Sequence, residues 1–151
     1  MADPRIVDFA ELESLVGQDV GASDWHVIDQ DRVNLFADAT GDHQWIHVDV
    51  ERATREMGSP IVHGYLTLSL LPMLSAEVLA VSGVTRGINY GSDKVRFTNM
   101  VPVGSKVRLV QKCLSVSDKA GGKQMIMESK IEIEGQDRPA LVAEAISVLY
   151  G

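Results

Sequence analysis

Three segments in the second half of the chain alternate apolar and polar residues with the period of two that is typical of β-strands. They span residues 106–116, 123–134 and 141–149. In the middle segment, Ile131 and Ile133 point to one side and the charged residues beside them point to the other. Short turns join the three segments. The pattern therefore predicts an antiparallel sheet with one apolar face.

Helical spacing of apolar residues is found instead in the first half of the chain. It predicts one helix over residues 32–39, with Asp29 or Asp31 as its N-cap, and another over residues 50–57, with Asp49 as its N-cap. Short polar side chains at these positions accept hydrogen bonds from amides of the first helical turn, which have no partner inside the helix.

A mostly apolar run covers residues 64–81 and separates the two halves. It is apolar on nearly all sides, so we interpret it as a buried helix that Pro72 kinks. Short aromatic or β-branched stretches predict further strands over residues 24–28, 87–90 and 93–97.

These elements predict the α+β fold class, with one long central helix wrapped by a curved antiparallel sheet. At 151 residues without a linker or repeat, residues 1–151 are expected to form a single domain. The exposed edge of such a sheet and the ends of the helix are natural contact surfaces for a second subunit, so we expect a homodimer.

Composition and charge narrow the class of protein. The hydrophobic fraction of 45% is that of an ordinary globular chain, and the net charge of −7 argues against a nucleic-acid partner. No apolar run approaches the length that spans a membrane, so no membrane partner is expected. The one cysteine, Cys113, lies in an alternating segment and is expected to be a packing residue. A single cysteine cannot form an internal disulfide, which favours a cytoplasmic location.

Candidate chemistry is concentrated in residues 36–70. Asp42 follows Thr40-Gly41, His47 comes five positions later, and Gly64 opens the apolar run. A carboxylate and an imidazole that reach the same water can share its proton transfers. A free N–H at the start of a helix can bind an oxyanion. We therefore expect Asp42 and His47 to be an acid/base pair, with the Gly64 N–H as the oxyanion donor.

Each of these residues also has a structural interpretation. Asp42 can close a turn after Gly41, and His47 can be a buried histidine with satisfied hydrogen bonds. His43, His47 and Asp49 have spacing that suggests a metal site, but no strong helix supports it and a fourth ligand is missing, so no metal is expected. His63 is expected to be a packing or hydrogen-bonding residue at the helix entrance.

The segment FADATGDHQWIHVD, residues 36–49, resembles the signature of MaoC-like (R)-specific enoyl-CoA hydratases, which have the hotdog fold. In that signature an aspartate follows a Ser/Thr-Gly pair and a histidine stands five positions later. The segment IVHGYLTLSL, residues 61–70, resembles the start of the family's central helix. One departure is Gln44-Trp45, where the family usually has Asn-Pro. It leaves the acid/base pair in place and changes the loop that shapes the substrate pocket.

The resemblance implies hydration of trans-2-enoyl-CoA to (R)-3-hydroxyacyl-CoA. It assigns the acid/base role to Asp42 and His47 and the oxyanion role to the Gly64 N–H, without a cofactor. The expected partner is thus an acyl-CoA substrate.

Three other functions remain open on the same sequence. One is the dehydration of 3-hydroxyacyl thioesters on acyl-carrier protein in fatty-acid synthesis, which is the same chemistry in reverse. Another is a thioesterase, in which water attacks the carbonyl carbon. The last is a non-catalytic acyl-CoA-binding subunit, which the presence of both Asp42 and His47 argues against. The leucines and methionines between residues 66 and 74 are expected to fill the core.

Overall fold

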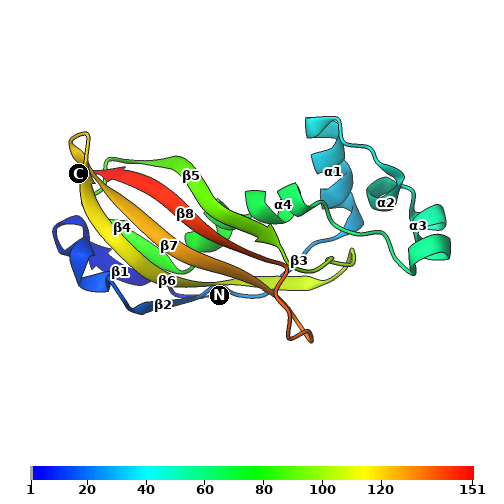
Figure 1. Ribbon diagram of the computed structural model, residues 1–151, viewed down its shortest axis with the longest axis horizontal. Coiled ribbons are helices and arrows are strands. Elements are labelled where there is room, and N and C mark those ends of the chain that lie inside the picture. The colour runs from blue at the N-terminus through cyan, green and yellow to red at the C-terminus, as the bar shows by residue number, and fades with distance from the viewer. Residues whose placement is uncertain (1) are drawn as a thin grey trace.

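An antiparallel sheet forms the body of the molecule in the computed structural model, which describes residues 2–151 (Figure 1). Its strands lie in the order β2-β6-β7-β8-β5, and β3 adds to the edge of β6. The strands are β2 (Asp19–Ala22), β3 (His26–Val27), β5 (Arg86–Phe97), β6 (Lys106–Lys119), β7 (Gly122–Ile133) and β8 (Leu141–Tyr150). The predicted α+β class and the antiparallel order of the last three strands are confirmed.

The alternation in the sequence correctly assigns the faces of the sheet. Val107, Leu109 and Cys113 of β6 are fully buried, and Ile131 and Ile133 of β7 lie beside them. The complete burial of Cys113 confirms it as a packing residue, and burial raises the pKa of its thiol.

One strand replaces the two that were predicted over residues 87–90 and 93–97. β5 runs continuously along β8, and its register shifts between Asn89 and Gly91 and again between Asp93 and Arg96. These irregularities are β-bulges, which bend a strand without ending it. Lys94 accordingly adopts a positive φ of 53°. The segment between the two predicted strands is therefore a bend within one continuous strand.

The apolar run is helical for a shorter distance than predicted. It forms α4 (Gly64–Ser69) and α5 (Leu71–Ser75), which meet at Leu70, and then leaves the helix. Pro72 lies in the first turn of α5, where its missing N–H costs least. Among residues 2–151, no helix has the length and apolarity needed to cross a bilayer.

The end of the predicted helix is a strand. β4 (Leu79–Ser82) pairs in parallel with β1 (Arg5–Asp8). The prediction of a helix to residue 81 was wrong because a short apolar run fits a strand and a buried helix equally well. The choice depends on a partner strand that lies more than seventy residues away in the sequence.

The broken helix lies against the apolar face of the sheet. Its leucines and the inward residues of the strands form one core, which includes Leu66, Leu70, Leu71, Leu74, Leu109, Met127, Ile131 and Leu141. Burying one such side chain contributes about 1.5–3 kcal/mol. The core therefore holds α4 firmly at the position from which the site is built.

Three short helices stand together beyond one end of the sheet, at the right of Figure 1. They are α1 (Gln30–Thr40), α2 (Trp45–Val48) and α3 (Val50–Met57). The Asp29 and Asp49 carboxylates cap α1 and α3, at 2.9 Å from the Arg32 amide and 3.1 Å from the Arg52 amide. The 3-10 helix η1 (Phe9–Leu15) follows β1 at the far end of the molecule. The loop from α1 to α2 lies at the helical end.

Candidate active site

The backbone fixes the tautomer of the neutral His47 ring. Its Nδ1 lies 2.7 Å from the carbonyl oxygen of Ile61. Because a carbonyl can only accept a hydrogen bond, Nδ1 carries the proton and the neutral ring keeps its lone pair on Nε2. The side chain is 7% exposed. The Gln30 side chain also donates to the His47 carbonyl at 2.8 Å, which ties α2 to α1.

Asp42 lies in the loop directly after α1. Gly41 ends that helix in the left-handed conformation, with φ of 83°, which is the conformation that glycine adopts at least cost. One carboxylate oxygen of Asp42 accepts a long hydrogen bond of 3.3 Å from the Gln44 amide. The carboxylate thus closes a turn, as its structural interpretation proposed, and its exposed position leaves it accessible to a ligand as well.

Asp42 and His47 come together, with His63 as a third member. One nitrogen or carboxylate oxygen from each of the three lies within 4.8 Å of the others. The rings of His47 and His63 stack, with centroids 3.9 Å apart and planes 22° apart. The Nε2–H of His63 donates to the Asp42 carbonyl at 3.1 Å. The expectation that His63 packs and forms hydrogen bonds at the helix entrance agrees with this geometry.

Burial is the main influence on the charge of His63, which is 2% exposed. Desolvation lowers the pKa of His63, the hydrogen bond to the Asp42 carbonyl opposes this shift, and the neighbouring His47 adds to it. Its Nδ1 is buried and has no hydrogen-bond partner among the described residues. His63 is therefore a neutral ring that donates through Nε2.

The metal site considered from the sequence is not assembled. His43 instead pairs with the exposed Asp38 at 2.9 Å, and this contact raises the pKa of His43. The Asp49 carboxylate is engaged as the cap of α3.

The residues that do cluster are poorly arranged for a metal ion. The rings of His47 and His63 are nearly parallel, so their in-plane lone pairs run side by side rather than toward one point. A tetrahedral metal needs converging donors, so the geometry of this cluster does not fit one.

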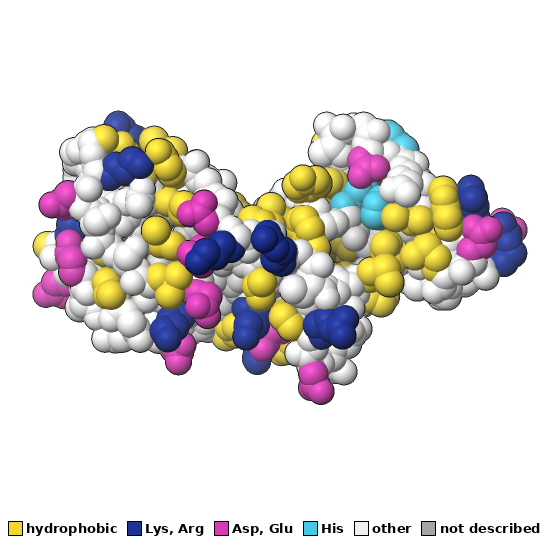
Figure 2. Space-filling view, viewed as in Figure 1, with side chains coloured by type: hydrophobic (Ala, Val, Ile, Leu, Met, Phe, Trp, Pro, Cys, Tyr) yellow, Lys and Arg dark blue, Asp and Glu magenta, His cyan; other side chains and the backbone are white. Residues whose placement is uncertain are grey.

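A cavity of about 370 Å³ adjoins His47. Its wall includes Ile61, Val62, Gly64, Thr67, Phe97, Thr98, Asn99, Met100, Val101, Arg138 and Ala140. His47 belongs to both this wall and the cluster with Asp42, so it links the carboxylate to the cavity. Figure 2 shows histidine side chains at the surface of the helical end, next to exposed apolar side chains.

Gly64 lies in the cavity wall at the first position of α4. A Cβ at this position would be 3.0 Å from the Phe97 ring. Only glycine fits here without displacing that ring, and its amide is one of the first-turn N–H groups that have no partner within the helix.

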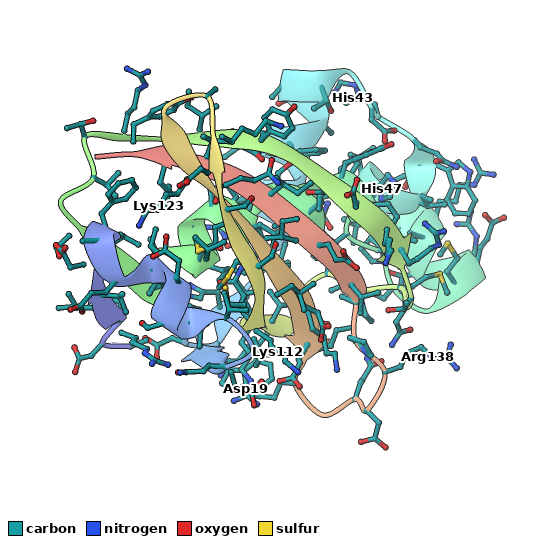
Figure 3. All side chains as sticks on the ribbon, turned by 60° about the vertical axis from the view of Figure 1, so that its left-hand side comes forward. Asp19, His43, His47, Lys112, Lys123 and Arg138 are labelled. Carbon is teal, nitrogen blue, oxygen red and sulfur yellow. The ribbon has the colours of Figure 1, made fainter. Side chains whose placement is uncertain are left out.

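Arg138 is a residue of the cavity that sequence reasoning did not single out. It follows the turn after β7 and lies at the same end of the molecule as His47 (Figure 3). The Asn99 side chain donates to the Arg138 carbonyl at 3.3 Å and to the Gln136 side chain at 2.7 Å, which fixes the turn. No local pattern indicated it, because the cavity joins segments that are distant in the sequence.

A larger, mostly apolar cavity of about 800 Å³ lies between the broken helix and the sheet. Leu68, Leu71, Met125 and Met127 are among its wall residues. Leu66, Leu70, Leu71 and Leu74 are buried in the core, as expected, and Leu71 contributes to both the core and this cavity. The expectation was wrong for Met73, which is 37% exposed, and Leu68 is only partly buried against the core.

Comparisons of the sequence with known proteins and protein families agree with one another. Residues 11–135 match the family described as "MaoC like domain". The chain is 51% identical over 139 residues to 3-hydroxyacyl-thioester dehydratase Z of Mycobacterium tuberculosis, with 91% of this chain and 92% of that protein covered. It is 42% identical to Nodulation protein N of Rhizobium leguminosarum bv. viciae, with 95% and 91% covered.

Solved structures support the same assignment. The R-hydratase PhaJ1 from Pseudomonas aeruginosa superposes with a TM-score of 0.75 at 26% identity, over 94% of this chain and 84% of that chain. The (R)-hydratase from A. caviae superposes with a TM-score of 0.71 at 25% identity, over 87% and 94%. The chain belongs to the MaoC-like family of hydratases and dehydratases, which are lyases with the hotdog fold.

Proposed function

We propose that residues 1–151 form one MaoC-like domain that hydrates trans-2-enoyl-CoA to (R)-3-hydroxyacyl-CoA. The observation that carries the proposal is the convergence of the Asp42 carboxylate and the His47 imidazole within 4.8 Å, beside a cavity that Gly64 also lines. The similarity to two R-hydratases supports the direction and stereochemistry.

The chemistry follows from the protonation form of His47. Its Nε2 lone pair and the Asp42 carboxylate both accept hydrogen bonds, so together they orient one water and remove its proton. The water oxygen bonds to C3 as the C2–C3 π bond breaks, and the proton that the pair takes from the water passes to C2, so that the elements of one water are added. Negative charge that develops on the thioester oxygen is stabilised by the Gly64 N–H. We propose that the larger apolar cavity takes the acyl chain.

A second candidate is the dehydration of 3-hydroxyacyl thioesters on acyl-carrier protein. The dehydratase that is 51% identical to this chain favours it. The same groups serve both directions, because a catalyst accelerates forward and reverse steps alike. Measuring kcat/KM on matched CoA and carrier-protein thioesters decides between the two substrates.

The acid/base pair is tested by single substitutions. Asp42→Asn and His47→Ala are each expected to reduce kcat for crotonyl-CoA hydration by about 10²-fold or more, the typical contribution of general acid–base catalysis. Loss of enoyl-thioester absorbance measures the rate. Asp38→Asn and His43→Ala are the matched controls, because this exposed pair lies nearby but outside the cluster. Unchanged rates in both test variants would refute the proposal.

The oxyanion role is tested by comparing Gly64→Ala with Gly64→Pro. Both add a Cβ against Phe97, and only proline removes the N–H. Proline suits this position, because it is the first of α4 and His63 already has φ of −57° and ψ of 135°. We expect kcat of the proline variant to be lower by about 10²-fold, the effect of losing one oxyanion donor. Equal kcat values in the alanine and proline variants would exclude the Gly64 N–H as the oxyanion donor.

Arg138 is proposed to bind a phosphate of the substrate. It lines the cavity and has no ion-pair partner within residues 2–151. Arg138→Ala is expected to reduce kcat/KM on an enoyl-CoA by about tenfold, through KM, as loss of ~1.4 kcal/mol would do. The enoyl thioester of N-acetylcysteamine lacks phosphate, so its kcat/KM should not change. Arg55→Ala, on exposed α3, is the control; equal losses on both thioesters would refute the phosphate contact.

We also propose a homodimer that forms through β5. This strand is last in the sheet order, and Ile88, Tyr90 and Phe97 on it are 46%, 57% and 47% exposed. An exposed edge with apolar side chains is a pairing surface. The mass in solution, measured by light scattering, should be twice the 16.4 kDa of one chain, and Ile88→Lys should lower it. A wild-type monomer at micromolar concentration would contradict this.

A further inference from the structure

His63 is a buried titratable residue for which the proposed chemistry provides no role. It is the N-cap residue of α4, directly before Gly64, and is 2% exposed. One face of its ring stacks on His47 at 3.9 Å, and Phe36 lies 4.9 Å away at a 55° tilt. The ring is therefore packed against α1 and α2 and does not line the cavity beside His47.

Among the described residues, the only side-chain hydrogen bond of His63 goes to Asp42 in the neighbouring loop. Its Nε2–H donates to the Asp42 carbonyl at 3.1 Å. The other hydrogen bonds of Asp42 are longer, at 3.3 Å from the Gln44 amide to its carboxylate and 3.5 Å from its own amide to Thr40. Within the described residues, the bond from His63 is thus the shortest hydrogen bond that Asp42 itself makes, and it ties this residue to the entrance of α4.

The surroundings of His63 favour its neutral form, in which the one ring proton is on Nε2 and is donated to Asp42. A second proton would sit on the buried Nδ1, which has no acceptor among residues 2–151. The groups that titrate nearby are His47 on α2, and Asp42 and His43 in the loop before it, with His43 paired to Asp38 of α1. A charged His63 would also repel a protonated His47 across the stack.

We propose that His63 is a positioning residue, whose Nε2–H holds the Asp42 loop so that the carboxylate and the stacked His47 ring converge on one water. The inference rests on the proposed hydratase function. It gives a role to a histidine that has one ring nitrogen buried without a hydrogen-bond partner among the described residues. His63 itself does not touch the reacting atoms.

Two variants separate the hydrogen bond from the ring. His63→Phe keeps the stacked ring and loses the donor, whereas His63→Gln keeps an N–H near the position of Nε2 and loses the ring. We expect kcat of the phenylalanine variant to fall by about 10- to 100-fold, the effect of a small misplacement of reacting groups, with KM within about twofold. The glutamine variant should retain most of the wild-type kcat. His43→Phe, in the exposed neighbour, is the control and should keep its kcat.

Thermal stability distinguishes positioning from a merely structural role. Phenylalanine removes a buried nitrogen that lacks a partner, so Tm of the His63→Phe variant should stay equal or rise while kcat falls. Three results would each overturn the proposal: wild-type kcat in the phenylalanine variant, equal losses in both variants, or a loss of kcat that accompanies a lower Tm.

Hydrogen exchange tests the role of His63 without measuring turnover, so its result does not depend on the proposed hydratase function. The Gln44 amide is bonded to the Asp42 carboxylate, so its hydrogen exchange reports the order of the loop. We expect faster exchange in His63→Phe and near wild-type exchange in His63→Gln. If the wild-type protein hydrates no enoyl thioester, the proposed function fails, and the exchange rates alone decide whether His63 holds the loop. Unchanged exchange in His63→Phe would overturn the inference.

Discussion

The hydrogen bond from His47 Nδ1 to the Ile61 carbonyl determines the chemistry of the site. It places the proton on the buried side of the ring and leaves the lone pair on Nε2. It also connects the helical end of the molecule to its core. The Ile61 amide bonds to the Ile46 carbonyl, and the Val62 amide bonds to Val101 beside the cavity. The segment before α4 therefore fixes the tautomer of His47 and the position of the cavity wall together.

The broken helix explains why the site lies where it does. Leucines of α4 and α5 anchor the helix to the sheet, so its first residue, Gly64, has a fixed position. The end of β5 brings Phe97 over that glycine, and the turn after β7 brings Arg138 to the same cavity. The groups that surround the cavity thus come from segments that the sheet brings together, with the acid/base pair supplied by a loop and a short helix. A site held by rigid elements on several sides keeps its geometry without substrate.

Much of the architecture follows from local patterns. The alternation predicted which residues of β6 and β7 are buried. The cap at Asp49 was correctly identified, and Asp29 is the cap among the two alternatives, Asp29 and Asp31, that the sequence left open. The proximity of Asp42 and His47 was also expected, because they are close in the sequence and both follow the turn at Gly41. Sequence patterns were sufficient wherever the contacts that determine the structure join residues close together in the sequence.

The features that the sequence patterns failed to predict share one physical cause. Residues 79–82 form a strand because β1 lies beside them, and β5 continues through its bulges because β8 pairs along its length. The stack of His63 on His47 and the place of Arg138 likewise depend on how distant segments pack. No periodicity encodes such contacts, so a single sequence read by its local patterns cannot reveal them.

The most direct test of the account is a crystal structure of the protein with a bound (R)-3-hydroxyacyl-CoA. The account requires the 3-hydroxyl group within hydrogen-bond distance of both the Asp42 carboxylate and His47 Nε2, with the thioester oxygen at the Gly64 N–H. A product whose hydroxyl group contacts neither side chain, with the thioester bound elsewhere, would contradict it.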